Sequence, residues 1–77
     1  MKSTNIFIPN LVGAKEFVNI TSKYTDFKMN LKSDNYIIDA HSIIGILSLD
    51  LSKTIILETE SNVPTEFFTE IHQFIEE

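Results

Sequence analysis

The chain has 77 residues, 43% of them hydrophobic, no cysteine, and six lysines against eleven acidic residues, which gives a net charge of −5. The length predicts a single domain over residues 1–77, and the composition is typical of a globular protein. The lack of cysteine excludes disulfides and thiol chemistry, and a negative chain without arginine is poorly suited to bind nucleic acid. No apolar run reaches the ~20 residues of a membrane span and the N-terminus lacks a signal-peptide core, so we expect a cytoplasmic protein with no membrane contact.

The first two predicted elements are a strand and a helix. Residues 5–8, with the sequence NIFI, predict a short strand that Pro9 ends. From Leu11 to Tyr24, apolar side chains recur at helical spacing. Asn10 directly precedes this stripe, and asparagine is a favoured N-cap because its side-chain oxygen accepts a hydrogen bond from a first-turn amide.

A hairpin and a short helix are predicted next. Residues 27–32 alternate strictly between apolar and polar, which indicates a half-buried antiparallel strand. The turn residues 33–35 and the run 36–40 then predict the return strand of a hairpin. The string SIIGIL at 42–47 is ambiguous by period alone, but Ser42 at its head and Gly45 inside it favour a short helix with Ser42 as N-cap.

The last two elements complete the fold. Residues 55–59 predict a strand with Ile55, Leu57 and Thr59 on one face. A final helix is expected from Pro64, which suits a first turn, through an apolar stripe that ends at Ile75. The order βαββαβα predicts an α+β open-faced two-layer β-sandwich, in which three helices cover one face of a four-stranded antiparallel sheet.

Two stretches, FVNITSKY at 17–24 and SIIGILSL at 42–49, together with the element order, resemble HPr, the histidine-containing phosphocarrier of the bacterial sugar phosphotransferase system. The resemblance covers nearly the whole chain and implies the sandwich fold just described. It also implies a cytoplasmic protein that takes phosphate from Enzyme I on one histidine and passes it to sugar-specific IIA components. In many Gram-positive members, HPr kinase/phosphorylase also phosphorylates the serine that opens the short helix.

The active-site motif is where this chain departs from that family. The family pattern is G-[LI]-H-[AT]-R-P-A at the start of the first helix, and the matching positions here are Asn10 for the histidine, Val12 for the arginine and Gly13 for the proline. A phosphohistidine carrier needs an imidazole nitrogen as nucleophile, and a carboxamide is not a phosphoryl acceptor. The sequence therefore predicts no catalytic residue, no enzymatic activity and no cofactor.

The resemblance implies two further features around the short helix. Ser42 stands at the regulatory phosphorylation position, a role compatible with an N-cap because phosphate is favoured at a helix N-terminus. The apolar residues of this helix form a docking surface in the family, and their simplest alternative role is core packing. These residues are Ile43, Ile44, Ile46 and Leu47.

The two histidines and the acidic residues of the last helix give no stronger site. His41 is expected to be an exposed turn residue. His72 and Glu76 have the i, i+4 spacing of helical metal ligands, but two ligands do not make a metal site, so we expect a solvated pair. Glu66 and Glu70 are interpreted as solvated helix charges, and no metal site is predicted.

The leading hypothesis is an HPr-like protein that has lost the phosphohistidine site and acts as a regulatory or protein-interaction module. Its partners by resemblance are HPr kinase/phosphorylase or components of the phosphotransferase system. One alternative is a working phosphocarrier with an unrecognised acceptor. Another is a small structural domain unrelated to sugar transport.

Overall fold

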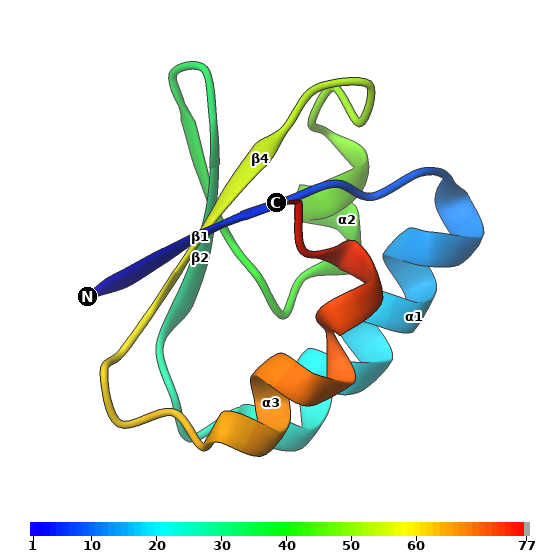
Figure 1. Cartoon of the computed structure of the whole chain (residues 1–77). Coiled ribbons are helices and arrows are strands. Elements are labelled where there is room, and N and C mark those ends of the chain that lie inside the picture. The colour runs from blue at the N-terminus through cyan, green and yellow to red at the C-terminus, as the bar shows by residue number, and fades with distance from the viewer. Residues whose placement is uncertain (77) are drawn as a thin grey trace.

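The computed structural model describes residues 1–76 and shows a four-stranded antiparallel sheet covered on one face by helices (Figure 1). The order is βαββαβα, which confirms the predicted open-faced α+β sandwich. Within these residues, no helix is long and apolar enough to cross a membrane. The elements are β1 Lys2–Ile6, α1 Leu11–Thr21, β2 Met29–Ser33, β3 Tyr36–Asp39, α2 Ile43–Leu47, β4 Ile55–Thr59 and α3 Thr65–Glu70, with 3-10 turns at Ser22–Tyr24 and His72–Phe74.

The sheet has the strand order β1-β4-β2-β3, so β4 and β2 form its centre and β1 and β3 its edges. Side chains alternate between its two faces, and Ile55, Leu57 and Thr59 of β4 all point into the core as predicted. Leu31 of β2 is paired with Leu57, and both are fully buried under the helices. The opposite face carries half-polar residues such as Glu58 and remains uncovered.

Aromatic side chains join the helices to one another above the sheet. Phe17 of α1 is fully buried and meets the ring of Phe74 edge-on, with centroids 5.6 Å apart. Tyr24 and Phe67 of α3 make a similar edge contact at 5.2 Å. Such edge-to-face pairs are favourable beyond the apolar area they bury. They join α1 to the last 3-10 turn, and the 3-10 turn after α1 to α3.

The predicted continuous last helix is wrong. α3 ends at Glu70, the chain makes a 3-10 turn, and Ile75 is extended with φ −72° and ψ 128°. The Phe7 amide donates to the carbonyl of Phe74 at 2.8 Å, and the Glu76 amide donates to the carbonyl of Asn5 at 2.9 Å. The last residues therefore pair with β1, because an edge strand offers unpaired backbone groups that a neighbouring segment can satisfy.

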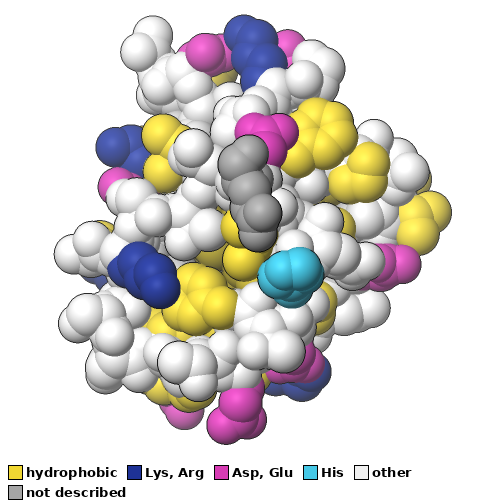
Figure 2. Space-filling view, viewed as in Figure 1, with side chains coloured by type: hydrophobic (Ala, Val, Ile, Leu, Met, Phe, Trp, Pro, Cys, Tyr) yellow, Lys and Arg dark blue, Asp and Glu magenta, His cyan; other side chains and the backbone are white. Residues whose placement is uncertain are grey.

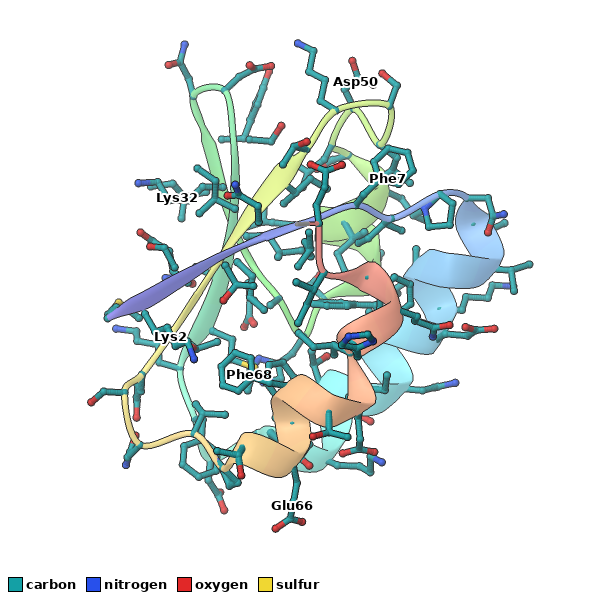
Figure 3. All side chains as sticks on the ribbon, in the orientation of Figure 1. Lys2, Phe7, Lys32, Asp50, Glu66 and Phe68 are labelled. Carbon is teal, nitrogen blue, oxygen red and sulfur yellow. The ribbon has the colours of Figure 1, made fainter. Side chains whose placement is uncertain are left out.

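The first strand, which also pairs with the chain end, runs from Lys2 to Ile6 rather than over residues 5–8 as predicted. Lys2 belongs to this strand through its pairing with Thr59 of β4, and its ammonium lies 4.3 Å from the centroid of the Phe68 ring on α3 (Figure 3). The hairpin strands are slightly shorter than predicted, since β2 begins at Met29 and β3 ends at Asp39.

Glu70 is not a simple solvated charge, which corrects the prediction for it. Its carboxylate accepts a hydrogen bond from the hydroxyl of Tyr24 at 2.5 Å and forms an ion pair with Lys23. These two bonds lower the pKa of Glu70, and the bond to Glu70 raises the pKa of Tyr24 to about 12. The cluster ties the end of α1 to α3.

We expect the stabilising effect of this cluster to disappear in acid. Because the folded protein holds the pKa of Glu70 below the usual 4.5, the contribution is present above that value and is lost as pH falls through the lower folded pKa. The difference in Tm between the natural protein and a Glu70→Gln variant should therefore shrink when thermal unfolding is measured from about pH 7 to about pH 3. Glu66→Gln on the same helix is the matched control, and a Glu70→Gln difference that does not change with pH contradicts the expectation.

Candidate functional site

The start of α1 is organised by the side chain of Asn10. Its backbone is extended, with φ −167° and ψ −176°, and its Oδ1 accepts a hydrogen bond from the amide of Gly13 at 2.9 Å. This confirms the predicted N-cap. The carboxamide oxygen is thereby committed to the helix, at the position where the resemblance implies a reactive histidine.

We expect Asn10→Ala to lower the free energy of unfolding by about 1 kcal/mol, because one first-turn amide loses its acceptor. Asn10→Asp and Asn10→Ser keep an acceptor at the cap and should stay within about 1 kcal/mol of the natural protein. Urea unfolding of the three variants measures this. A stable Asn10→Ala variant would show that the cap is dispensable.

A cavity of about 410 Å³ lies beside this cap. Its wall combines the segment from Pro9 to Gly13 with Glu16 on the next turn of α1 and with Gln73 and Phe74 from the end of the chain. Glycine fits at position 13 because a Cβ there would come 3.1 Å from Cδ of Pro9. Glu16 accepts a hydrogen bond from Nε2 of Gln73 at 3.2 Å, and it is the sole charged residue among residues 1–76 that lines the cavity.

Apolar side chains near the mouth of the cavity are exposed to solvent. Leu11 and Val12 of α1 expose 49% and 63% of their surface, and Figure 2 shows hydrophobic side chains gathered over the segment that leads from β1 into α1. Val12 occupies the position that the resemblance assigns to the arginine. The cavity therefore combines apolar side chains with the polar Asn10 and Gln73 and the negative charge of Glu16, and no basic side chain among residues 1–76 lines it.

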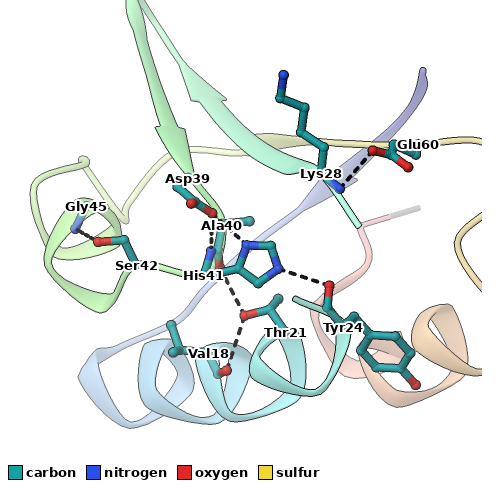
Figure 4. A network of polar contacts seen from close by, with 10 residues as sticks. All are labelled: Val18, Thr21, Tyr24, Lys28, Asp39, Ala40, His41, Ser42, Gly45 and Glu60. Atoms are coloured by element: carbon teal, nitrogen blue, oxygen red, sulfur yellow. Dashed lines mark hydrogen bonds and ion pairs between the residues drawn. The ribbon is translucent and has the colours of Figure 1, made fainter. Parts of the chain in front are cut away.

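α2 packs against α1 and begins at Ser42. The Ser42 hydroxyl oxygen accepts a hydrogen bond from the amide of Gly45 at 3.1 Å, which confirms the predicted N-cap (Figure 4). Gly45 lets this helix lie close to β3, because a Cβ at that position would come 3.1 Å from Cδ1 of Ile38. Ser42 itself is half-buried.

The predicted docking surface on α2 is wrong in part. Ile46 is fully buried and Ile43 is half-buried against the core, because these two residues lie on the side of the helix that faces the sheet. Ile44 is 80% exposed and Leu47 is 47% exposed. We define the α1–α2 surface as the exposed apolar residues of the two packed helices, namely Leu11, Val12, Ile44 and Leu47.

His41 is not the exposed turn residue that the sequence suggested. Its Nδ1 lies 2.7 Å from Oδ1 of Asp39, which also accepts the His41 backbone amide at 2.8 Å, and its Nε2 lies 3.3 Å from the carbonyl of Tyr24 (Figure 4). The two bonds that Asp39 accepts from His41 lower the pKa of Asp39, the backbone bond contributing most. Thr21 reinforces the same junction by donating to the carbonyl of Ala40 at 3.1 Å. The ring therefore joins α1 to the loop before α2.

The remaining sequence candidates do not assemble into a site. Glu76 lies beyond the last helical turn, so the helical spacing proposed for His72 and Glu76 does not exist, and Glu76 instead accepts a hydrogen bond from Thr54. Glu66 lies in the first turn of α3 and points away from the molecule in Figure 3. Residues 1–76 contain no group of three or more histidine, aspartate or glutamate side chains that could hold a metal ion.

The sequence missed two residues of the cavity, Glu16 and Gln73. Glu16 lies one turn after Val12, at i+4, so its presence on the same helix face was available from the spacing. Gln73 carried no such signal, because it reaches the cavity only through the pairing of the chain end with β1.

Comparisons with known proteins agree with this architecture. No family model matches the chain, and no curated protein matches it. Among solved structures, the chain is similar to the crystal structure of HPr-C-His from Thermoanaerobacter tengcongensis, with a TM-score of 0.75 and 30% sequence identity over 95% of this chain and 89% of that one. With this identity over nearly the whole of both chains, and with the same kind of open-faced sandwich, the chain belongs to the HPr family.

Proposed function

We propose that this protein is a non-catalytic HPr-like module that regulates or binds other proteins without carrying phosphate. The observation that carries the proposal is the cavity beside Asn10. A phosphoryl group carried there would need a nucleophilic imidazole and positive charge around it. The cavity lining instead presents a carboxamide engaged as a helix cap, an apolar Val12 and the negative charge of Glu16.

The histidines elsewhere offer no better acceptor. Both ring nitrogens of His41 lie within hydrogen-bond distance of acceptors, Asp39 and the Tyr24 carbonyl. His72 is exposed on the 3-10 turn, away from a helix N-terminus that would stabilise a phosphoryl group.

The α1–α2 surface supports a role in protein binding. Ile44 and Leu47 expose apolar area on α2, and Leu11 and Val12 do so on α1, the helix that α2 packs against. Exposed apolar side chains that gather on one face of a small protein are typical of contact sites. In the HPr family this part of the fold is a docking surface, so the loss of the histidine and the retention of the surface are compatible.

Incubation with Enzyme I and labelled phosphoenolpyruvate tests the proposal. We expect no acid-labile label on the chain under conditions that fully label an ordinary HPr. Label on the natural protein would overturn the proposal and favour a carrier with an unrecognised acceptor, which His72→Gln and His41→Gln variants would then locate.

Phosphorylation of Ser42 is the expected regulatory event. HPr kinase/phosphorylase should modify Ser42 more slowly than it modifies an ordinary HPr, because the hydroxyl is half-buried in its cap and phosphate adds about −1.5 to −2 to a chain that already carries −5. Intact mass after incubation with kinase and ATP measures the modification, with Ser42→Ala as control. No mass gain would contradict it and leave Ser42 as a helix cap alone.

A further inference from the structure

The cavity beside Asn10 has a chemistry opposite to that of an anion site. Its charged lining residue is Glu16, one oxygen of which accepts from Gln73 at 3.2 Å. The Glu16 side chain is exposed to solvent, and its other carboxylate oxygen, Oε1, makes no hydrogen bond within residues 1–76 and is free to meet a ligand. Because Gln73 uses its amide nitrogen in this bond, its Oε1 is a second acceptor at the same end of the cavity.

The rest of the cavity mixes polar and apolar side chains. Pro9, Val12 and Phe74 supply its apolar walls and Asn10 also lines it, and its volume of about 410 Å³ falls within the usual range for small ligand pockets, roughly 300–1,000 Å³. A side chain with a long apolar stem and a cationic head matches this arrangement, since the stem can cover the walls while the head reaches the acceptors.

From this charge complementarity we infer that the cavity binds an arginine side chain of a partner protein, flanked by apolar residues that cover the α1–α2 surface. The guanidinium is planar and presents two parallel N–H donors to a carboxylate, which suits Glu16 better than the point charge of lysine. The net charge of −5 favours approach of such a basic segment. This inference rests on the proposed function and names the chemistry of its partner.

A cation can bind at Glu16 although the positive end of the α1 helix dipole lies nearby. The positive end of the helix lies at Asn10, where the Gly13 amide is already satisfied by the cap. Glu16 lies one turn beyond Val12, and helix-dipole effects fade within the first turn. The cation is therefore placed at the Glu16 end of the cavity, and the Asn10 end contacts the backbone and stem.

The experiment is an NMR titration of the full chain with a capped leucyl-arginyl-leucine tripeptide. A matched tripeptide with citrulline in place of arginine has nearly the same shape without the charge, and inorganic phosphate is the anionic probe. We expect the arginine peptide to shift the amides of Val12, Gly13, Glu16 and Gln73 saturably. The citrulline peptide should bind up to about 5-fold more weakly, since an ion pair with an exposed carboxylate is worth at most about 1 kcal/mol, and phosphate should not bind.

Two variants of equal charge change locate the effect. Glu16→Gln should weaken binding of the arginine peptide up to about 5-fold and leave binding of the citrulline peptide unchanged. Glu66→Gln, which lies at the exposed start of α3, should change neither. Any of four results overturns the inference. The two peptides bind equally, the arginine peptide binds Glu16→Gln as well as the natural protein, the arginine peptide does not bind at all, or phosphate shifts the amides of Val12, Gly13, Glu16 and Gln73 saturably. The proposed function fails only if Enzyme I labels the chain with phosphate, which is a separate measurement. The two failures can therefore be told apart.

Discussion

Replacing Phe17 with alanine is expected to remove a large part of the stability of this protein. Phe17 is fully buried and packs edge-on against Phe74, so its removal leaves a cavity between α1 and the end of the chain. Phenylalanine-to-alanine changes in cores cost about 3–5 kcal/mol. A domain of this size has a total stability of roughly 4–11 kcal/mol. Domains usually melt at about 45–65 °C. With the loss from Phe17→Ala, a large fraction of the variant molecules should therefore be unfolded near 40 °C.

Urea and thermal unfolding followed by circular dichroism measure this loss. Val12→Ala is the matched control, because Val12 lies on the same helix and is 63% exposed, and it should change stability by about 0.5 kcal/mol or less. A Phe17→Ala variant that unfolds at the same urea concentration as Val12→Ala would show that the contact between α1 and the chain end contributes little.

Restoring the carrier reaction is expected to need more than the histidine. Asn10→His places an imidazole at the start of α1, but Val12 and Glu16 would leave the phosphoryl group with an apolar and a negative neighbour. Asn10→His combined with Val12→Arg adds a cationic donor for the phosphoryl oxygens. Loss of one such donor typically costs about 100-fold in rate, so the double variant should accept phosphate from Enzyme I about 100-fold faster than the single variant.

The rate of acid-labile labelling measures this difference. Asn10→Gln combined with Val12→Arg is the control, because it supplies the guanidinium without a nucleophile and should remain unlabelled. If Asn10→His alone is labelled as fast as the double variant, the missing arginine does not limit the reaction.

The features that depend on neighbours in the sequence were predicted well. The caps at Asn10 and Ser42 and the inward face of β4 follow from local spacing and local hydrogen bonds. The prediction of a helix up to Ile75 was wrong because the last residues form backbone hydrogen bonds with β1 instead. Helical periodicity in the sequence does not report the position of a distant strand.

The candidate site could likewise be predicted only in part from the sequence. Asn10 and Val12 could be placed from the motif, but the charge of the cavity depends on Glu16 and Gln73, which come together only in the folded chain. The α1–α2 surface was half predicted, because the resemblance could not say which side of a five-residue helix faces the sheet, and Ile46 proved to be core.

The pairing of Glu76 with Asn5 and of Phe74 with Phe7 has a mechanical consequence. The two segments are antiparallel, so a force that pulls Lys2 and Glu76 apart loads their hydrogen bonds one after another, as in a zipper, rather than all at once. Resistance to such a force is low, and the bond at Asn5 breaks before the bond at Phe7. Tension between the ends would thus release Phe74 and open the cavity wall while the central strands of the sheet remain intact.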